Sequence, residues 1–245
     1  MHTLWLLLAT SALVAGVLAI ASRASMDLAL AEQAARRELA QESAVALVIH
    51  DILIRGSGSR WLRPPLATDT VDIEGHRILL TVQNVSGLVD AGTGHTKVLA
   101  ALLAEVLDVG GANALAHIGT ARGKTVAGMR PFSTYAELRA AAHLSDRDFN
   151  ALYRHVTIFS GRSLPDPLLA TPGLATVLRL NRGATQPISA MEAKGSAAGS
   201  TYRIEAVSVS VGDPGRQTLS LEVTITGRLR PGYLIRSWQY LPPDA

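Results

Sequence analysis

The stretch LWLLLATSALVAGVLAI, from Leu4 to Ile20, decides how the rest of this 245-residue chain is interpreted. No Asp, Glu, Lys or Arg occurs before Arg23, so residues 1–22 form one uncharged segment. At about 1.5 Å per residue a helix of this length spans roughly 33 Å, which matches the hydrocarbon core of a membrane. The segment therefore predicts a transmembrane anchor. Its expected lipid-facing residues are Leu4, Trp5, Leu6, Leu7, Leu8, Leu13, Val14, Val17, Leu18 and Ile20.

Two other interpretations of this segment stay open. A cleaved signal peptide could use Ala19-Ile20-Ala21 as its small-residue site, although no Lys or Arg precedes the apolar run. A buried helix of a soluble domain is the third. Residues 23–42 contain three arginines and four acids, so the C-terminal flank is not strongly basic, and this permits the body of the protein to lie outside the cytoplasm.

The helix is expected to continue through residues 23–55. This segment contains no Gly or Pro, and Ala, Leu, Glu, Gln and Arg dominate it. Apolar residues recur at intervals of three, four and seven, which predicts an amphipathic helix whose stripe packs on a folded domain or on a partner subunit. We call the following residues the apolar stripe: Leu28, Ala31, Ala35, Leu39, Ala46, Ile49 and Leu53.

The rest of the chain predicts an α+β fold with an antiparallel sheet and a large helical insertion. Residues 71–83 suggest a hairpin that turns at Glu74-Gly75. Residues 94–180 look helical, with Ser145 as the N-cap of a helix over 149–156. The runs from Tyr202 onward alternate as an antiparallel meander with one buried face. The predicted units are a β domain of residues 56–87 and 201–245, a helical insertion of residues 88–182, and a Gly-, Ala- and Ser-rich linker of residues 183–200.

Several chemistries find no support in the residues. The chain has no cysteine, which excludes disulfide scaffolds, cysteine–zinc sites and thiol catalysis. The segment from Gly119 to Thr125 resembles a phosphate-binding loop, but it has three residues instead of four before its Gly-Lys pair. None of the seven histidines lies three or four residues from another. We therefore expect no catalytic residues, no cofactor and no metal ion. A net charge of +3, with dispersed basic residues, predicts no nucleic-acid partner.

Four segments in order carry a resemblance to a known family. They are Val85–Asp90 before a Leu-rich helix, Pro131–Arg139, Phe149–Gly161 and Asp166–Leu178, and the closing strands Tyr202–Ala206 and Leu234–Gln239 add to them. In this order the sequence resembles the K-type minor pseudopilins of type II secretion systems, and with the N-terminal helix the resemblance covers most of the chain.

The resemblance implies a non-enzymatic subunit at the tip of the pseudopilus, where it initiates and caps assembly during protein export. It implies single-pass insertion in the inner membrane and a periplasmic globular domain. The expected partners are other minor pseudopilins, with secreted substrates as further candidates. Major pseudopilins carry an acid near the mature N-terminus, whereas the K type lacks it, and residues 1–22 contain none. Prepilins have a short basic leader that ends in Gly, and none precedes the apolar run in this sequence. Family members can bind calcium, but the chain has no dense cluster of acids.

Two alternatives from other functional classes remain. The helical block is similar to helix-hairpin-helix modules, so an envelope-anchored DNA-binding module is the second hypothesis. Its first turn, Ala142–Ser145, lacks the Gly that lets backbone approach a phosphate, and only Pro172-Gly173-Leu174 has one. An envelope hydrolase is the third hypothesis, and no residues can be named for it.

Overall fold

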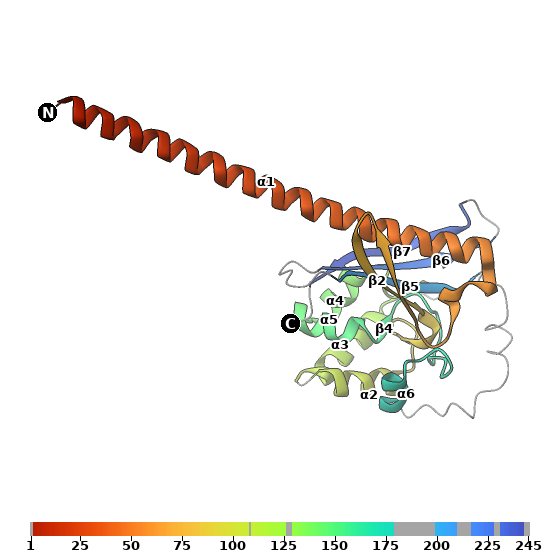
Figure 1. Ribbon diagram of the computed structural model, residues 1–245. Helices are drawn as coiled ribbons and strands as arrows, with labels where there is room; N and C mark the ends of the chain where they lie inside the picture. Colours follow the sequence, from red (N-terminus) through yellow and green to blue (C-terminus); the bar gives the residue numbers. More distant parts are fainter. Residues whose placement is uncertain are drawn as a thin grey trace.

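A single long helix precedes the sheet and the helices of the insertion. The computed structural model of the protein describes residues 2–107, 109–125, 129–178, 199–209, 217–227 and 231–242, without the side chains of residues 2–14, 17 and 19. Helix α1 runs without a break over 54 residues, His2–Arg55. Its N-terminal part projects from the body and its C-terminal part lies along the sheet (Figure 1). The predicted long N-terminal helix is thus confirmed.

The predicted anchor receives no support from the described part of the chain. In that part no helix combines the length and the apolar character that a membrane span requires. The residues Leu4 to Val14 and Val17 lie outside the set whose side chains are described. Of the other two, Leu18 is 63% exposed and Ile20 is 70% exposed. The membrane-spanning character of residues 1–22 stays a prediction.

The sheet has five antiparallel strands in the order β1-β2-β5-β6-β7. Strands β1 (Ala67–Ile73) and β2 (His76–Asn84) form the predicted hairpin. Its turn residues Glu74 and Gly75 have φ of 49° and 83°, as a tight two-residue hairpin turn requires. Strands β5 (Thr201–Ser208), β6 (Thr218–Ile225) and β7 (Tyr233–Leu241) form the meander. The antiparallel sheet expected from the sequence is therefore confirmed.

The C-terminal half of α1 covers one face of this sheet. Its core-facing residues pack on the inward side chains of β2, β5 and β6. These α1 residues are Ala40, Ala44, Val45, Val48, Ile49 and Ile52. Gln41 ties α1 to the sheet, since its side-chain amide donates to the carbonyls of Ala206 and Gln217 at 3.1 and 2.8 Å. The chain leaves α1 through two 3-10 turns, η1 (Gly56–Gly58) and η2 (Arg60–Leu62).

The opposite face of the sheet is also buried, which corrects the prediction of a meander with one buried face. Every described residue of β5 and β6 is buried or half-buried. In the sequence, the polar residues that alternate with apolar ones along β5 and β6 look like a solvent-exposed face. In the folded chain they lie under the helical insertion and pair with one another, which removes the cost of burying them.

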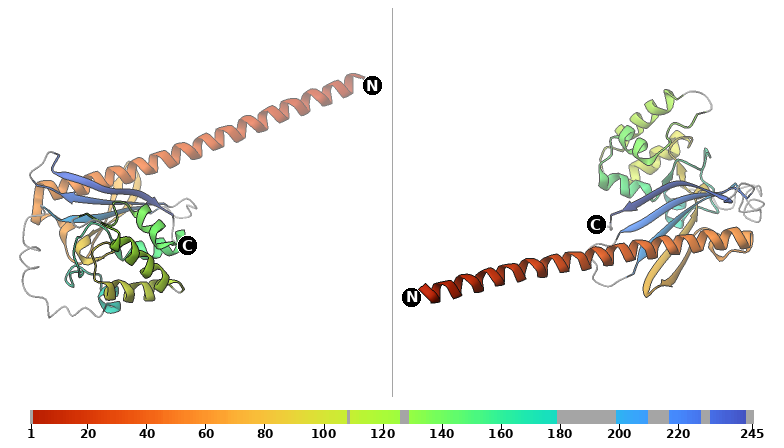
Figure 2. Two further views of the ribbon diagram at one scale, coloured as in Figure 1. Left: turned by 180° about the vertical axis from the view of Figure 1, so that it is seen from behind. Right: turned by 90° about the horizontal axis from the view of Figure 1, so that it is seen from above.

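The insertion lies between β2 and β5 and has its own apolar core. It begins with the turn η3 (Val85–Gly87) and β3 (Val89–Asp90), which pairs in parallel with β4 (Val156–Thr157). Its helices lie on the side of the sheet away from α1 (Figure 2). They are α2 (Thr96–Val106), α3 (Gly111–Gly123), α4 (Tyr135–Ala142), α5 (Asp146–Tyr153) and α6 (Pro172–Val177).

The prediction that residues 94–180 are helical was partly wrong. Helix α5 ends at Tyr153 instead of Val156, and β4 and an irregular segment over 158–171 follow it. Val156-Thr157-Ile158-Phe159 is β-branched and aromatic, and such a short run does not distinguish strand from helix by periodicity. The Ser145 cap is confirmed, because its side chain accepts the Asp148 N–H. The linker predicted over 183–200 lies outside the described residues except for 199 and 200.

Candidate assembly surface

The apolar stripe, which lies on α1, is mostly exposed. Leu28 is 70% exposed, Leu39 is 62% exposed, and Ala31, Ala35 and Ala46 are also on the surface. Only Ile49 is buried, and Leu53 is half-buried against the sheet core. The structure therefore corrects the interpretation of the whole stripe as the face that packs on the protein's own domain.

The angular positions of the residues around the helix axis explain why most of the stripe is exposed. At about 100° per residue, the stripe lies roughly 130° around the helix axis from the face centred on Val48 that packs on the sheet. The two apolar faces meet only at Ile49. Because the protein's own core uses one face, the other remains free along the helix from Leu28 to Ala46. An exposed apolar row of this length, with three alanines that permit close approach, suits packing against another helix.

The stripe lies beside an uncovered edge of the sheet. The Tyr240 hydroxyl on β7 donates to Glu42 Oε1 at 3.2 Å, and Glu42 lies next to the stripe on the helix surface. The five strands are about 20 Å wide, whereas a helix is about 10 Å in diameter. In the view from above, α1 crosses the sheet and leaves part of β7 uncovered (Figure 2), although Tyr233 and Tyr240 of β7 pack against the core beneath the helix. On that face Ile235 and Trp238 are each 43% exposed. The stripe and these two side chains together form the candidate assembly surface.

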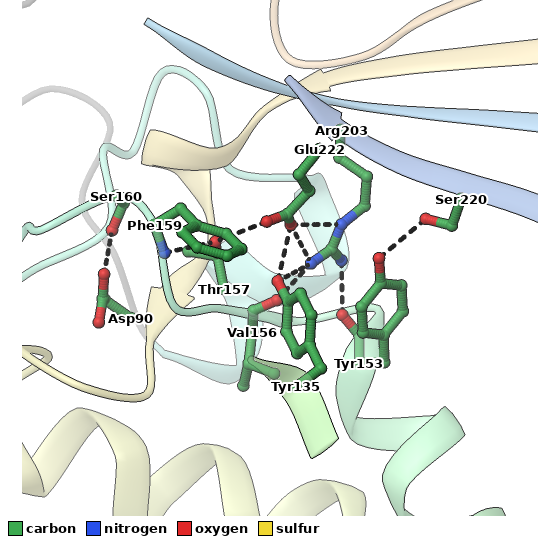
Figure 3. Close-up of polar contacts among 10 residues, drawn as sticks. All are labelled: Asp90, Tyr135, Tyr153, Val156, Thr157, Phe159, Ser160, Arg203, Ser220 and Glu222. Carbon is green, nitrogen blue, oxygen red and sulfur yellow. Dashed lines mark hydrogen bonds and ion pairs between the residues drawn. The ribbon is translucent and has the colours of Figure 1, made fainter. Parts of the chain in front are cut away.

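A buried polar cluster joins the insertion to the sheet. Arg203 on β5 and Glu222 on β6 face each other across paired strands, and their Nη2 and Oε1 atoms are 2.6 Å apart. Their side chains are 3% and 0% exposed. Arg203 also donates to the carbonyls of Tyr153 and Val156, at 2.5 and 2.6 Å. One side chain of the sheet thereby holds the end of α5 and the start of β4 (Figure 3).

Two tyrosines of the insertion complete this cluster. Tyr135 on α4 donates to Glu222 Oε1 at 2.7 Å, and the Tyr153 hydroxyl lies 2.8 Å from Ser220 Oγ. Burial raises the pKa of Tyr135 well above its ordinary value, and the Glu222 carboxylate reinforces this. Burial likewise raises the pKa of Tyr153 to about 12. Both phenols therefore keep their protons at physiological pH. The cluster is fully paired and well placed to fix the insertion rigidly, rather than to react.

A second buried carboxylate organises the turn after β3. Asp90 accepts the backbone N–H groups of Gly92 and Thr93 with one oxygen, at 2.8 and 2.9 Å. Its other oxygen accepts from the Ser160 hydroxyl and the Gly161 N–H. Asp90 thus ties the β3 turn to the segment after β4, in the same way that Arg203 ties the insertion to the sheet.

The segment resembling a phosphate-binding loop has a structural role. Gly119 to Gly123 is the C-terminal part of α3, so no loop wraps a ligand there. The Arg122 guanidinium donates to the carbonyls of Ala91, Gly94 and Asp90 at 2.9, 2.9 and 3.3 Å. The Arg122 side chain therefore holds the C-terminal end of α3 against the turn that follows β3.

A groove of about 730 Å³ lies on the insertion, between α2, α5 and α6. Leu102, Val106 and Leu174 contribute its apolar wall, and Arg147 and Arg154 contribute basic groups. Burial lowers the pKa of the neighbouring His155, and Arg154 adds to this effect. The groove shows no arrangement of nucleophile and base. Within the described ranges, no group of three or more His, Asp or Glu side chains lies close enough together to share one metal ion.

Comparison with known proteins identifies the architecture. No protein-family model matches the sequence, and no curated protein matches it. A chain in the crystal structure of the GspK-GspI-GspJ complex from the enterotoxigenic Escherichia coli type 2 secretion system does match the fold. The TM-score is 0.52 at 10% sequence identity, over 86% of this chain and 98% of the other. The fold is pseudopilin-like.

The pseudopilin-like fold supports the coarse form of the resemblance seen in the sequence, without distinguishing the K type. Sequence reasoning found the stripe and the helix that carries it. It did not predict that β7 borders the stripe. The sequence of one strand does not show which of its residues a helix from elsewhere in the chain leaves exposed. Sequence reasoning also missed the Arg203–Glu222 pair, whose only signal was one basic and one acidic residue on adjacent predicted strands.

Proposed function

We propose that this chain is a minor pseudopilin of a type II secretion system, which sits at the tip of the pseudopilus and initiates and caps its assembly. One observation carries the proposal. Helix α1 packs one apolar face on its own sheet and leaves a second apolar face exposed, in a fold like that of a chain from a pseudopilin complex. A subunit that assembles laterally through its N-terminal helix needs such a second face.

The position at the tip is supported by the composition of the N-terminal segment. Residues 1–22 contain no acid. The K type, which the sequence resembles, lacks the carboxylate with which a major pseudopilin engages the amino terminus of a neighbouring subunit. A subunit without that carboxylate can lie at the end of a filament but does not repeat along it.

The same segment supports the proposed location. Its 22 uncharged residues are long enough for a single pass through the inner membrane, and the body would then lie in the periplasm. We propose no catalytic activity and no cofactor, because the paired Arg203–Glu222 cluster and the Asp90 turn are both occupied with structural hydrogen bonds.

The partners we propose are other minor pseudopilins, and the neighbour named above is itself a complex of GspK, GspI and GspJ. A partner helix would lie along the stripe, with its far side against Ile235 and Trp238 of β7. Burying this apolar surface would favour the complex through the hydrophobic effect.

Coexpression with the other minor pseudopilins of the same genome tests the proposal. The full chain should copurify with them from detergent-solubilised membranes. Ala35→Asp places an unpaired charge in the stripe and should reduce recovery of the complex at least tenfold, a loss of about 1.4 kcal/mol or more.

Ala29→Asp is the matched control. Ala29 is also exposed on α1 but lies about 120° from the stripe, so this variant should assemble like the wild type. Equal recovery of both variants would remove the stripe from the interface. Failure of the wild-type chain to copurify would contradict the proposed function itself.

The DNA-binding alternative predicts a different result. A helix-hairpin-helix module would retard duplex DNA at low salt, and the effect would weaken as salt is raised. We expect no retardation by the full chain.

A further inference from the structure

Two histidines that are 26 residues apart in the sequence meet on the surface of the insertion. His117 lies on α3 and His143 follows the last residue of α4. Their ring centroids are 4.5 Å apart and the ring planes meet at 62°. Both residues are exposed. Spacing along the chain gave no sign of this pair, because it depends on the packing of α3 against α4.

The backbone holds the two rings in place. Ala114 and Ile118 of α3 are buried with Leu138 and Ala142 of α4, so the two helices share one core beneath the histidines. His143 has φ of 53°, a left-handed conformation that is uncommon for residues other than Gly. Its N–H donates to the Ala140 and Arg139 carbonyls, which ends α4. Gly and Asn are the usual residues at such a helix end, and His is also enriched among the non-Gly residues that adopt this conformation.

The separation of the rings fits shared coordination. With metal–nitrogen distances of about 2.1 Å, two imidazoles at neighbouring positions on one ion have ring centres about 4.5–5 Å apart. Imidazole is a preferred ligand of Ni²⁺, Cu²⁺ and Zn²⁺, whereas Ca²⁺ and Mg²⁺ prefer oxygen. Two exposed rings leave the remaining positions to water.

We propose that His117 and His143 form a binding site for a divalent late transition-metal ion, which links α3 to the turn between α4 and α5. This departs from the sequence-based expectation of no metal site, and it does not depend on the proposed function. The ion would stabilise the insertion by binding only the folded state, since the unfolded chain does not hold the two rings together.

Thermal unfolding of the full chain with Ni²⁺ as the probe tests the site. At pH 7.5 a saturating concentration should raise the Tm, because the ion binds only the folded state. His117→Asn and His143→Asn should each weaken Ni²⁺ binding at least tenfold by calorimetry. Asn tolerates the left-handed conformation of residue 143, so this variant keeps the helix end.

His50→Asn is the control, because His50 is exposed on α1 and far along the chain from both. It should bind Ni²⁺ like the wild type. A second readout locates the ion in the unmutated protein, since paramagnetic Ni²⁺ should broaden the imidazole resonances of His117 and His143 first. Unchanged affinity in both histidine variants, or broadening that begins at other histidines, would overturn the proposal.

Discussion

At the scale of single residues, the Arg203–Glu222 pair holds the body together. Both charges are removed from water, and each has several partners: backbone carbonyls for Arg203, and Tyr135 and Thr157 for Glu222. A buried ion pair contributes little when compared with an apolar pair of the same shape, but removing one partner leaves a buried charge unpaired. The stability of the insertion on the sheet should therefore depend strongly on either residue alone.

Arg203→Met should lower the free energy of unfolding by about 3–5 kcal/mol, because the Glu222 carboxylate stays buried without its cation. Urea denaturation of the full chain measures this change. The double variant Arg203→Met, Glu222→Leu should lose less than Arg203→Met does, since it removes both charges. A single variant within about 1 kcal/mol of the wild type would contradict the role given to this pair.

Residue types were visible in the sequence, but their partners were not. Arg203 and Glu222 occupy the polar positions of alternating strands, and that pattern alone predicts a solvent face. Their burial depends on Tyr135 and Tyr153, which come from helices far along the chain. The same limit applies to Arg122, whose basic side chain suggests a phosphate ligand until its three carbonyl partners are seen.

At the scale of elements, local signals predicted most helices and strands correctly. The Ser145 cap, the Glu74-Gly75 turn and the unbroken helix through residue 55 each rest on short-range chemistry that the fold preserves. The failure over 156–171 has the opposite cause. That segment is held by long-range contacts, such as the hydrogen bonds of Gly161 to Asp90 and of Asp166 to Ser86, which no local pattern shows.

Two glycines test the packing of the elements. A Cβ at Gly87 would lie 2.2 Å from the Leu169 carbonyl oxygen, so Gly87→Ala forces η3 away from the 158–171 segment. We expect a loss of about 2 kcal/mol or more in the free energy of unfolding. A Cβ at Gly119, within α3, meets nothing within 4 Å. Gly119→Ala should stabilise the protein by about 0.5–1 kcal/mol, because Ala favours the helix.

Chemical denaturation of the two variants measures both effects against the wild type. Since Gly119→Ala is the same substitution in the same insertion, it separates steric conflict from the intrinsic preference of Ala. Equal stability of the two variants would show that the close approach at Gly87 does not constrain the fold.

At the scale of the whole molecule, the sheet has two differently used faces. Helix α1 covers part of one face through an apolar core, and the insertion covers the other through the paired polar cluster. The order of helix, hairpin, helical block and meander could be predicted from the sequence. The stacking could not, because β5 and β6 alternate in a way that equally fits an exposed second face.

This arrangement leaves the candidate assembly surface free on the side of α1. The exposed part of the stripe, from Leu28 to Ala46, and the exposed side chains Ile235 and Trp238 of β7 lie on the same side of the sheet, and none of these residues belongs to the protein's own cores. A body held rigidly by its buried cluster can thus present a long apolar row to a neighbouring subunit. The function we propose requires that this apolar row binds a partner subunit in the cell.

Protein export in a strain that lacks the gene tests this central claim most directly. The account predicts that type II secretion substrates accumulate in the periplasm of the deletion strain instead of reaching the medium. The wild-type gene and Ala29→Asp should restore export, and Ala35→Asp should not, although the variant protein is present at a normal level. Undiminished export by the deletion strain would contradict the account.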